Sequence, residues 1–315
     1  MSFLKTALFS NSKLLDDIEI SFLDVGARGD LPPPWLQLEA RFPSRLKVAG
    51  FETDAEELSK LKKTFPSRNY FPVGLGKING ETDFFLNNGK SSSSLFAPNE
   101  AMYGRFQDKH SNKRKVDRKV QVEVAKLDSL DLSSFRSAFA KLDVQGAELD
   151  ILSGGENFFG SNAIGFTAET WTYEVYKNQP LMHDVMKWAT ENNYELYGLE
   201  ETGRWDFNSP ATLTERGAPV CVDVLFFRSF SSFLDQQPTL DELISFALIL
   251  DLWGFSSRSL SLLERHENQA EVRDVSQLIK KCQKSRFFAK HKLNDMIDKI
   301  YIRLGLTPKF PPIHD

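Results

Sequence analysis

Carboxylate side chains stand at or near the ends of three predicted strands. Asp24 belongs to the first strand, Glu52 to the second, and Asp143 to a third strand much later in the chain. In an open α/β sheet, ligands bind outside the carboxyl ends of parallel strands, so we expect the three groups at one edge of the sheet. Carboxylates there can accept hydrogen bonds from hydroxyl groups, hold a cation or take up a proton.

The first strand, IEISFLDV at residues 18–25, runs directly into Gly26-Ala27-Arg28-Gly29-Asp30. Gly26 would let backbone approach a ligand closely, and Gly29 would allow a tight turn. We predict that Asp24, Gly26, Arg28 and Gly29 contact a cofactor. A structural turn after a buried strand explains the same pattern.

The second strand, residues 46–52, ends in Phe51-Glu52-Thr53-Asp54. An acid at this place can accept hydrogen bonds from both ribose hydroxyls of an adenosine ligand, so we assign Glu52 and Asp54 to the cofactor. A dinucleotide fingerprint would need G-x-G-x-x-G, but Arg28 and Leu31 occupy its second and third glycine positions. An adenosyl ligand without phosphates fits the sequence better.

The third stretch is AKLDVQGAE, where a buried strand delivers Asp143 to the same edge and a helix follows. Asp143 could serve as a helix N-cap or as a proton acceptor. Glu148 fits a helix start, where its charge complements the dipole. Glu169 ends the next strand and is the second candidate base. Asp143, Glu148 and Glu169 could share Mg²⁺ if they converge, but we predict no metal.

Two histidines are weaker candidates for chemistry. His183 falls on a predicted helix at 180–193 and fits surface or packing better than catalysis. His110 lies in a basic stretch that could fold over the site.

Strand-like and helix-like segments alternate from residue 18 to about 230, which indicates a mostly parallel sheet with helices on both faces. A detour at residues 80–130, with a hairpin-like arm and the SSSS run at 91–94, is long enough to belong to a binding site or its lid. The predicted strands are 18–25, 46–52, 70–75, 138–144, 163–169, 194–199 and 220–228.

Beyond Pro238 the apolar spacing becomes purely helical, with three helices expected around residues 239–248, 272–282 and 293–304. We therefore divide the chain into an N-terminal helix or arm (1–17), an α/β domain (18–232) and a helical C-terminal subdomain (233–315).

The composition is that of an ordinary globular chain, with 41% hydrophobic and 26% charged residues among 315. Only Cys221 and Cys282 occur, without metal-ligand or redox spacing, which argues against a disulfide scaffold and a zinc site. We find no signal peptide and no apolar run that could span a bilayer, so a cytoplasmic setting is expected.

Basic residues gather in two runs although the formal net charge is −4. Residues 280–303 hold eight basic and two acidic residues, and residues 109–119 hold six and one. Such runs are usually solvated surface. The functional interpretation is an anionic acceptor or partner attracted at long range, including peripheral contact with a membrane surface. No nucleic acid is expected, and the C-terminal helices could support a homo-oligomer.

Six segments in order resemble the FkbM-type methyltransferases: FLDVGARGD, GFETDAEEL, SSSSLFAPN, KLDVQGAELDILSGG, AETWTYEVYKNQPL and VDVLFFR. The resemblance covers roughly residues 20–230 and is most specific in KLDVQGAELDILSGG. It implies a Rossmann-like seven-stranded methyltransferase sheet whose last strand, 220–228, runs antiparallel. The chain departs from the family's D-V-G-A-N-x-G loop at Arg28 and Asp30.

The activity implied by the resemblance is methyl transfer from S-adenosylmethionine to a hydroxyl, commonly on a sugar, glycan or polyketide. By the same resemblance Asp24 and Gly26 match the cofactor loop, Glu52 the ribose-binding acid, and Asp143 the acid near the methyl group. A different class of function stays open: a Rossmann-like binding or assembly module without catalysis that uses its basic C-terminal helices to contact a partner.

Overall fold

The computed structural model describes residues 5–208 and 217–285. By its internal contacts the chain divides into two compact units. One comprises residues 19–36 and 44–239, and the other comprises residues 1–18, 37–43 and 240–315. The candidate site lies wholly within the first of these units.

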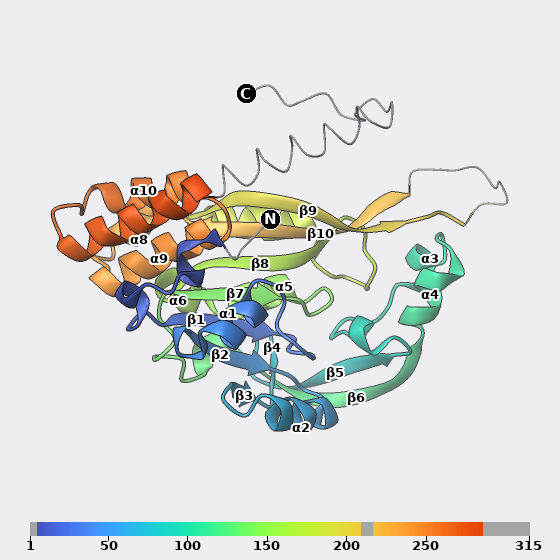
Figure 1. Cartoon of the computed structure of the whole chain (residues 1–315). Coiled ribbons are helices and arrows are strands. Elements are labelled where there is room, and N and C mark those ends of the chain that lie inside the picture. Colours follow the sequence, from blue (N-terminus) through green and yellow to red (C-terminus); the bar gives the residue numbers. More distant parts are fainter. Residues whose placement is uncertain (1–4, 209–216, 286–315) are drawn as a thin grey trace, which may run out of the picture. The chain divides into compact units, whose positions relative to one another are not determined.

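A seven-stranded sheet forms the centre of the first unit (Figure 1). Its strand order is β3-β2-β1-β7-β8-β10-β9. The strand β10 runs antiparallel to both of its neighbours, and the other neighbouring pairs are parallel. The predicted sheet with an antiparallel last strand is thereby confirmed. The strands are β1 (Ile20–Val25), β2 (Leu46–Phe51), β3 (Asn69–Phe71), β7 (Ala138–Leu142), β8 (Ala163–Trp171), β9 (Tyr194–Trp205) and β10 (Ala218–Arg228).

The predicted strand at 70–75 is wrong as a single element. It forms two short strands in different sheets, β3 and β4 (Gly74–Leu75). Pro72 follows β3 and has no N–H group with which to continue the ladder, so the chain leaves the main sheet there.

The excursion at 80–130 forms, together with β4, a second, three-stranded sheet of order β4-β6-β5. Its long strands β5 (Gly80–Asn87) and β6 (Val116–Ala125) pair antiparallel. The segment between them holds η5 (Lys90–Ser92), α3 (Glu100–Tyr103) and α4 (Asp108–Arg114), and α3 and α4 lie well beyond the end of β5 (Figure 1).

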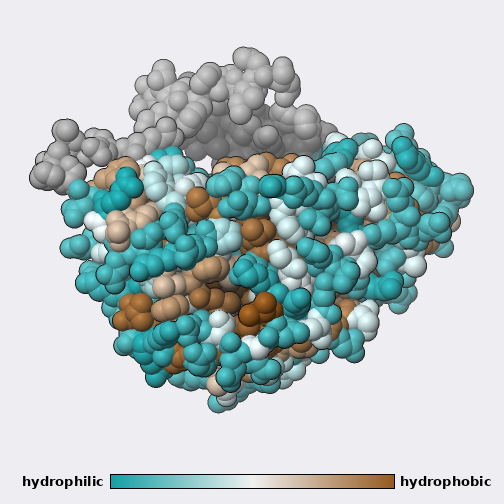
Figure 2. Space-filling view, turned by 180° about the vertical axis from the view of Figure 1, so that it is seen from behind, coloured by the Kyte–Doolittle hydropathy of each residue, from teal (hydrophilic) through white to brown (hydrophobic). Residues whose placement is uncertain are grey.

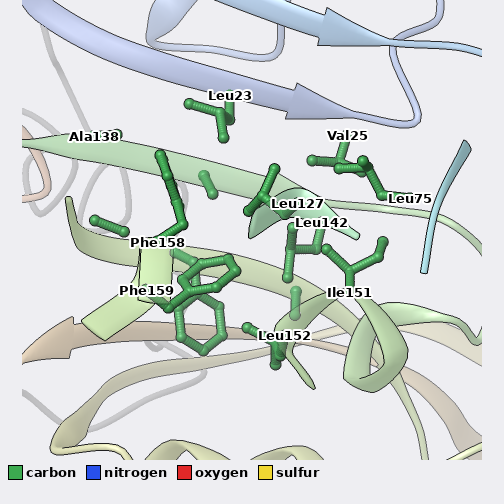
Figure 3. Packing of buried hydrophobic residues seen from close by; sticks show 14 of the residues in the cluster. Leu23, Val25, Leu75, Leu127, Ala138, Leu142, Ile151, Leu152, Phe158 and Phe159 are labelled. Carbon is green, nitrogen blue, oxygen red and sulfur yellow. The ribbon is translucent and has the colours of Figure 1, made fainter. Parts of the chain in front are cut away.

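The main hydrophobic core lies on one face of the sheet (Figure 3). Leu23, Val25 and Leu142 point into it from the strands, and Ile151 and Phe159 enter it from the covering helices. Those helices are α5 (Glu148–Gly154), α6 (Glu156–Ser161) and α7 (Met182–Glu191). The apolar face of α7 is the one predicted at 180–193.

Because side chains alternate along a strand, the neighbours of these core residues face the other way. Phe22 stacks on Trp35 on that second face, with ring centroids 4.4 Å apart. Further along the same strands the polar side chains of Asp24 and Lys141 occupy this face as directly paired residues. Asp24 and Lys141 therefore lie on the face opposite the core, near the carboxyl ends of their strands.

The remaining elements of the first unit are short. They are α2 (Ala55–Thr64), η6 (Leu127–Ser129) and α8 (Phe230–Leu234). Two further elements, α1 (Trp35–Arg41) and η4 (Pro43–Arg45), have residues in both units.

The described residues of the second unit form helices joined by turns, and none of them belongs to a strand. The unit contains η2 (Ala7–Phe9), η3 (Lys13–Leu15), α9 (Leu240–Leu252), α10 (Ser256–Glu264) and a helical stretch at 270–285. The fully buried Asp251 accepts hydrogen bonds from the Ala7 amide at 2.8 Å and from the Ser256 hydroxyl at 2.7 Å. These contacts tie the N-terminal segment to the C-terminal helices.

Two of the three predicted C-terminal helices correspond to α9 and to residues 270–285, and the third, at 293–304, lies outside the described residues. The helix α10 was not predicted, because three of its first four residues are serines and its apolar positions are few. Among the described helices, none has the length and apolarity to cross a membrane.

The molecular face shown in Figure 2 is mainly hydrophilic, with hydrophobic residues gathered in limited patches. Across the described chain the large apolar side chains with the greatest exposure are Ile78, Val116, Leu196 and Leu199. Isolated exposed aliphatic residues are normal in soluble domains, so these four alone identify no partner surface.

Candidate functional site

A cavity of about 290 Å³ opens at the carboxyl ends of β1, β2 and β7. The polar side chains that line it from the main sheet and its loops are Arg28, Glu52, Thr53, Lys141, Asp143 and Gln145, and Gly26 lines it with backbone. The excursion covers it with Phe84, Lys90, Ser91, Ser93 and Leu95, and apolar lining comes from Phe51, Val73 and Leu75. This combination of apolar lining and a few convergent polar groups is typical of small-molecule sites.

Gly26 brings the β1 loop into direct contact with the β7 loop. It has a positive φ of 79°, and a Cβ atom there would lie 2.2 Å from the carbonyl oxygen of Asp143. The Asp143 amide in turn donates to the Val25 carbonyl at 3.2 Å. Only glycine allows this approach, which places the first and third predicted motifs side by side.

Arg28 and Gly29 differ in their relation to the cavity. Arg28 lines it, and its Nε lies 3.8 Å from Oε2 of Glu52. Gly29 also has a positive φ, 68°, but it does not line the cavity and a Cβ there would meet nothing within 4 Å. Gly29 therefore allows the tight turn after β1, which is one of the two roles that the sequence predicted for it.

Glu52 and Asp54 use their carboxylates differently. Glu52 lines the cavity and accepts a hydrogen bond from the Asp54 amide at 2.8 Å. Burial raises the pKa of Glu52, against the opposing effect of that bond and of Arg28. Asp54 is outside the lining and caps α2, accepting from the amides of Glu56 and Glu57 at 2.9 and 3.2 Å. A cofactor contact of Asp54 remains a prediction.

Lys141 joins two of the predicted carboxylates. Its Nζ lies 3.2 Å from Oδ1 of Asp24 and 3.4 Å from Oδ2 of Asp143. Burial lowers the pKa of Lys141, but the two carboxylates outweigh that effect and the net shift is upward. Asp24 itself is buried behind the lysine and does not line the cavity. Sequence reasoning missed Lys141, although a lysine inside a buried apolar strand was a usable signal.

Asp143 lines the cavity with a half-exposed side chain. The N-cap of α5 is Ala147, and no side chain caps that helix, so the N-cap alternative for Asp143 is wrong. Glu148 instead satisfies the amides that precede the helix, accepting from Val144 at 3.0 Å and from Gly146 at 3.0 Å. Asp143 is thereby left to interact with Lys141, with Gln145 and with the cavity.

Gln145 connects the two candidate bases. Its Nε2 donates to Oδ1 of Asp143 at 3.3 Å and also to Oε2 of Glu169. Glu169 does not line the cavity and reaches it only through this amide. Gln145 was also missed, because an amide next to a glycine is typical of an ordinary turn.

Glu169 belongs to a row of acids across the sheet. It is the paired residue of Asp223 on β10, and Asp223 is in turn paired with Glu200 on β9. Burial and the charges of Asp143 and Glu148 raise the pKa of Glu169 to about 8. Burial, Asp143 and Glu200 raise the pKa of Asp223 to about 6.

One group of potential metal ligands is found among the described residues. Single ligand atoms of Glu169, Cys221 and Asp223 lie within 4.8 Å of one another. This group differs from the Mg²⁺ alternative considered above, because Glu148 is committed to backbone amides. An acidic cluster of this kind is common without a metal, and we assign no ion to it.

The raised carboxyl pKa values predict a specific dependence of stability on pH. Burial raises the pKa of Glu148 to about 7 and, with nearby charges, that of Glu169 to about 8. Between pH 5 and 8 the folded chain therefore keeps protons that the unfolded chain releases, and the free energy of unfolding should fall as pH rises. Each such proton contributes up to about 1.4 kcal/mol per pH unit.

Urea unfolding at pH 5, 6, 7 and 8 measures this slope. Glu169→Gln should flatten it, whereas Glu191→Gln, at an exposed position on α7, should leave it unchanged. An identical slope in the wild type and Glu169→Gln would show that Glu169 ionises normally.

The two histidines lie outside the cavity. His183 is 74% exposed on α7, which agrees with a surface role. His110 stacks on Trp205 with ring centroids 4.7 Å apart, and burial lowers its pKa. Neither contacts the predicted bases through any hydrogen bond of the described residues.

Comparison with known proteins is consistent with the geometry of this edge. The model of the methyltransferase FkbM domain matches residues 24–196, more than half of the chain. A solved FkbM methyltransferase from Methylobacillus flagellatus KT shares 14% identity at a TM-score of 0.36, over 66% of this chain and 44% of its own. This chain thus spans less than half the length of that structure.

Two further solved structures are similar at a comparable level. A TehB-like SAM-dependent methyltransferase from Corynebacterium glutamicum is 11% identical, with a TM-score of 0.32 over 69% of this chain and 86% of its own. Magnesium protoporphyrin IX methyltransferase from Synechocystis, solved with bound SAM, is 10% identical, with a TM-score of 0.33 over 70% and 74%. Among proteins with curated descriptions, none is significantly similar to this chain.

Proposed function

Because the chain belongs to the FkbM methyltransferase family, we propose that it transfers a methyl group to a hydroxyl of a sugar, glycan or related small molecule. The methyl donor of this family is S-adenosylmethionine, whose sulfonium supplies an already activated methyl group. The observation that carries the proposal is the position of Asp143, a carboxylate that lines the cavity and is held there by Lys141 and Gln145.

The residues of the cavity fit the cofactor. Gly26 leaves the backbone of the β1 loop open where any side chain would collide with Asp143, and Glu52 presents a carboxylate to the same space. Glu52 would hold the ribose hydroxyls, and Phe51, Val73 and Leu75 offer apolar surface to a base. None of these residues forms a pyrophosphate cradle, in agreement with a ligand that has no phosphates.

Asp143 is the proposed general base. Removing the hydroxyl proton in the transition state is worth roughly 10²–10⁴-fold in rate. Lys141 and Gln145 donate to the ionised carboxylate and hold it in one orientation at the cavity. Glu169 is the weaker candidate at neutral pH, because burial and neighbouring charges raise its pKa to about 8 and it then carries a proton.

Glu52→Ala should weaken cofactor binding by about 1.5–3 kcal/mol, the range for hydrogen bonds to a charged group. The variant also leaves the Arg28 guanidinium at the cavity without its carboxylate partner, so Arg28→Ala should be measured beside it. Calorimetric titration with S-adenosylmethionine gives both affinities. An unchanged affinity in Glu52→Ala would remove this carboxylate from the cofactor site.

The acceptor is proposed to be neutral or anionic. Arg28, Lys90 and Lys141 line the cavity, and a basic run continues along α4 and β6. The alternative proposal is a binding or assembly module that keeps the fold without turnover and contacts a partner through its C-terminal helices. The retained acids at the cavity favour the enzyme.

Label transfer separates the two proposals. Purified protein is incubated with S-adenosylmethionine carrying a deuterated methyl group and with a panel of monosaccharides, nucleotide sugars and glycans, and products are identified by mass spectrometry. A labelled methyl ether supports the enzyme, and methylation of amines alone would contradict a hydroxyl acceptor. Cofactor binding with no labelled product, either on the panel or in a metabolite extract, favours the module.

A further inference from the structure

A buried arginine, a tyrosine and a glutamine connect the excursion to the two candidate carboxylates. The Tyr176 hydroxyl is shared between the Ser92 carbonyl at 2.8 Å and Oε1 of Gln145 at 3.0 Å. The Gln145 amide then donates to Asp143 and Glu169. The amide is oriented with its nitrogen towards Asp143 and its oxygen towards the Tyr176 hydroxyl, because a flip would turn the oxygen towards the Asp143 carboxylate.

Arg114 supplies a positive charge near Tyr176, on the side of this network away from the carboxylates. It is only 8% exposed, and its guanidinium carbon lies 4.3 Å from the ring centre of Trp205 and 5.5 Å from that of Trp171. No carboxylate of the described residues lies within ion-pair distance of it. Burial raises the pKa of Tyr176, and the adjacent Arg114 opposes this. The phenol therefore stays protonated and donates towards the carboxylates.

The backbone of Gln145 adopts a conformation that few non-glycine residues adopt. Its φ of 60° is in the left-handed region, which is unfavourable for a non-glycine residue. The Ser94 hydroxyl holds this conformation by donating to the Gln145 carbonyl at 2.7 Å. Strained residues of this kind persist where the surrounding structure fixes them, and they cluster at functional sites.

We propose that Gln145 is a positioning residue, through which Tyr176 and Arg114 hold Asp143 and Glu169 in the orientation and charge state that methyl transfer requires. The Gln145 amide donates to both carboxylates, and the Tyr176 hydroxyl, which it shares with the Ser92 carbonyl, polarises that amide further. Because Ser92 and Ser94 belong to the segment that covers the cavity, the cover and the proposed base are fixed by the same contacts. The effect on catalysis rests on the proposed role of Asp143 as the base. The hydrogen bonds themselves do not depend on that role.

The titration of Glu169 can test this hydrogen-bond network in the absence of any methyl acceptor. Five groups besides Gln145 bear on it: Asp143 and Glu148 from the β7–α5 segment, Cys221 and Asp223 from β10, and Tyr176. Donors to the ionised form lower a carboxyl pKa. Loss of the Gln145 amide should therefore raise the pKa of Glu169 by about 1 unit, and loss of the Tyr176 hydroxyl by about half of that.

The test compares Tyr176→Phe with Tyr194→Phe by carbon NMR of labelled glutamate carboxyls, with Glu169 assigned from Glu169→Gln. Tyr194 is a matched control: its buried hydroxyl donates to the carbonyls of Phe159 and Ala163 at 2.7 and 3.2 Å, and it also adjoins an arginine, Arg228. Tyr176→Phe should raise the pKa of Glu169 and lower kcat about tenfold at unchanged cofactor Kd. Tyr194→Phe should change neither.

Gln145→Gly is the second variant, because glycine adopts the left-handed conformation without strain and the chain should fold. An unshifted Glu169 titration in both Gln145→Gly and Tyr176→Phe overturns the positioning role. The titration of Glu169 could shift in these variants although the wild-type protein transfers no methyl group. That result would support the positioning role and contradict the proposed function instead.

Discussion

Asp143→Asn is expected to lower kcat by roughly 10²–10⁴-fold while cofactor affinity changes by less than about tenfold. Asparagine keeps the size of the side chain and most of its hydrogen bonding but cannot take up the acceptor proton. Lys141 keeps Asp24 as a partner in the variant, so the lysine is not left without a carboxylate. The loss should therefore appear in the chemical step rather than in folding.

Asp150→Asn is the control for this variant. Asp150 lies on α5, outside the cavity lining, and its Oδ1 is 3.4 Å from Nζ of Lys77, the same separation as between Asp143 and Lys141. It should keep full turnover. Single-turnover rates, cofactor Kd and melting temperatures of both variants give the comparison. A normal rate in Asp143→Asn ends the base assignment, and a loss of affinity at retained kcat makes Asp143 a cofactor ligand.

Gly26→Ala is expected to abolish measurable cofactor binding and to destabilise the chain by about 3 kcal/mol or more. The added methyl would lie 2.2 Å from the Asp143 carbonyl oxygen, which is backbone and cannot move aside without displacing the β7 loop. The positive φ of 79° adds strain.

Gly29→Ala separates the collision from the strain. Gly29 has a similar φ of 68°, but a methyl there meets nothing within 4 Å. It should cost about 1 kcal/mol and leave cofactor affinity nearly unchanged. Denaturant unfolding and calorimetric titration measure both quantities. Equal losses of stability and of cofactor affinity in the two variants would show that Gly26 is not needed for the close approach of the β1 and β7 loops.

Most strands of the main sheet could be predicted because buried parallel strands are near-continuous apolar runs separated by helical periodicity. The split at Pro72 and the extension of β9 to Trp205 could not, because the polar residues 200–204 are paired with β10 only through tertiary contacts. The unpredicted α10 has the same origin: a serine-rich segment is helical where neighbouring helices bury its few apolar residues.

The candidate site was predictable where one strand end carried its own signal. Gly26, Glu52 and Asp143 each follow or close an apolar run, and all three line the cavity. Gln145 hydrogen-bonds Glu169, 24 positions away, and Tyr176 hydrogen-bonds Ser92, 84 positions away. The local sequence around each residue does not predict such long-range pairs. Asp54 illustrates the reverse case, since an acid at a strand end was also the N-cap of the following helix.

Titration of the full chain with S-adenosylmethionine alone tests the central claim most directly. The cavity at the ends of β1, β2 and β7 predicts one binding site per chain, competition by S-adenosylhomocysteine, and weaker binding in Glu52→Ala and Gly26→Ala than in Gly29→Ala. Absence of binding by the folded wild type, or equal binding by all three variants, would contradict the assignment of this cavity to the methyl donor.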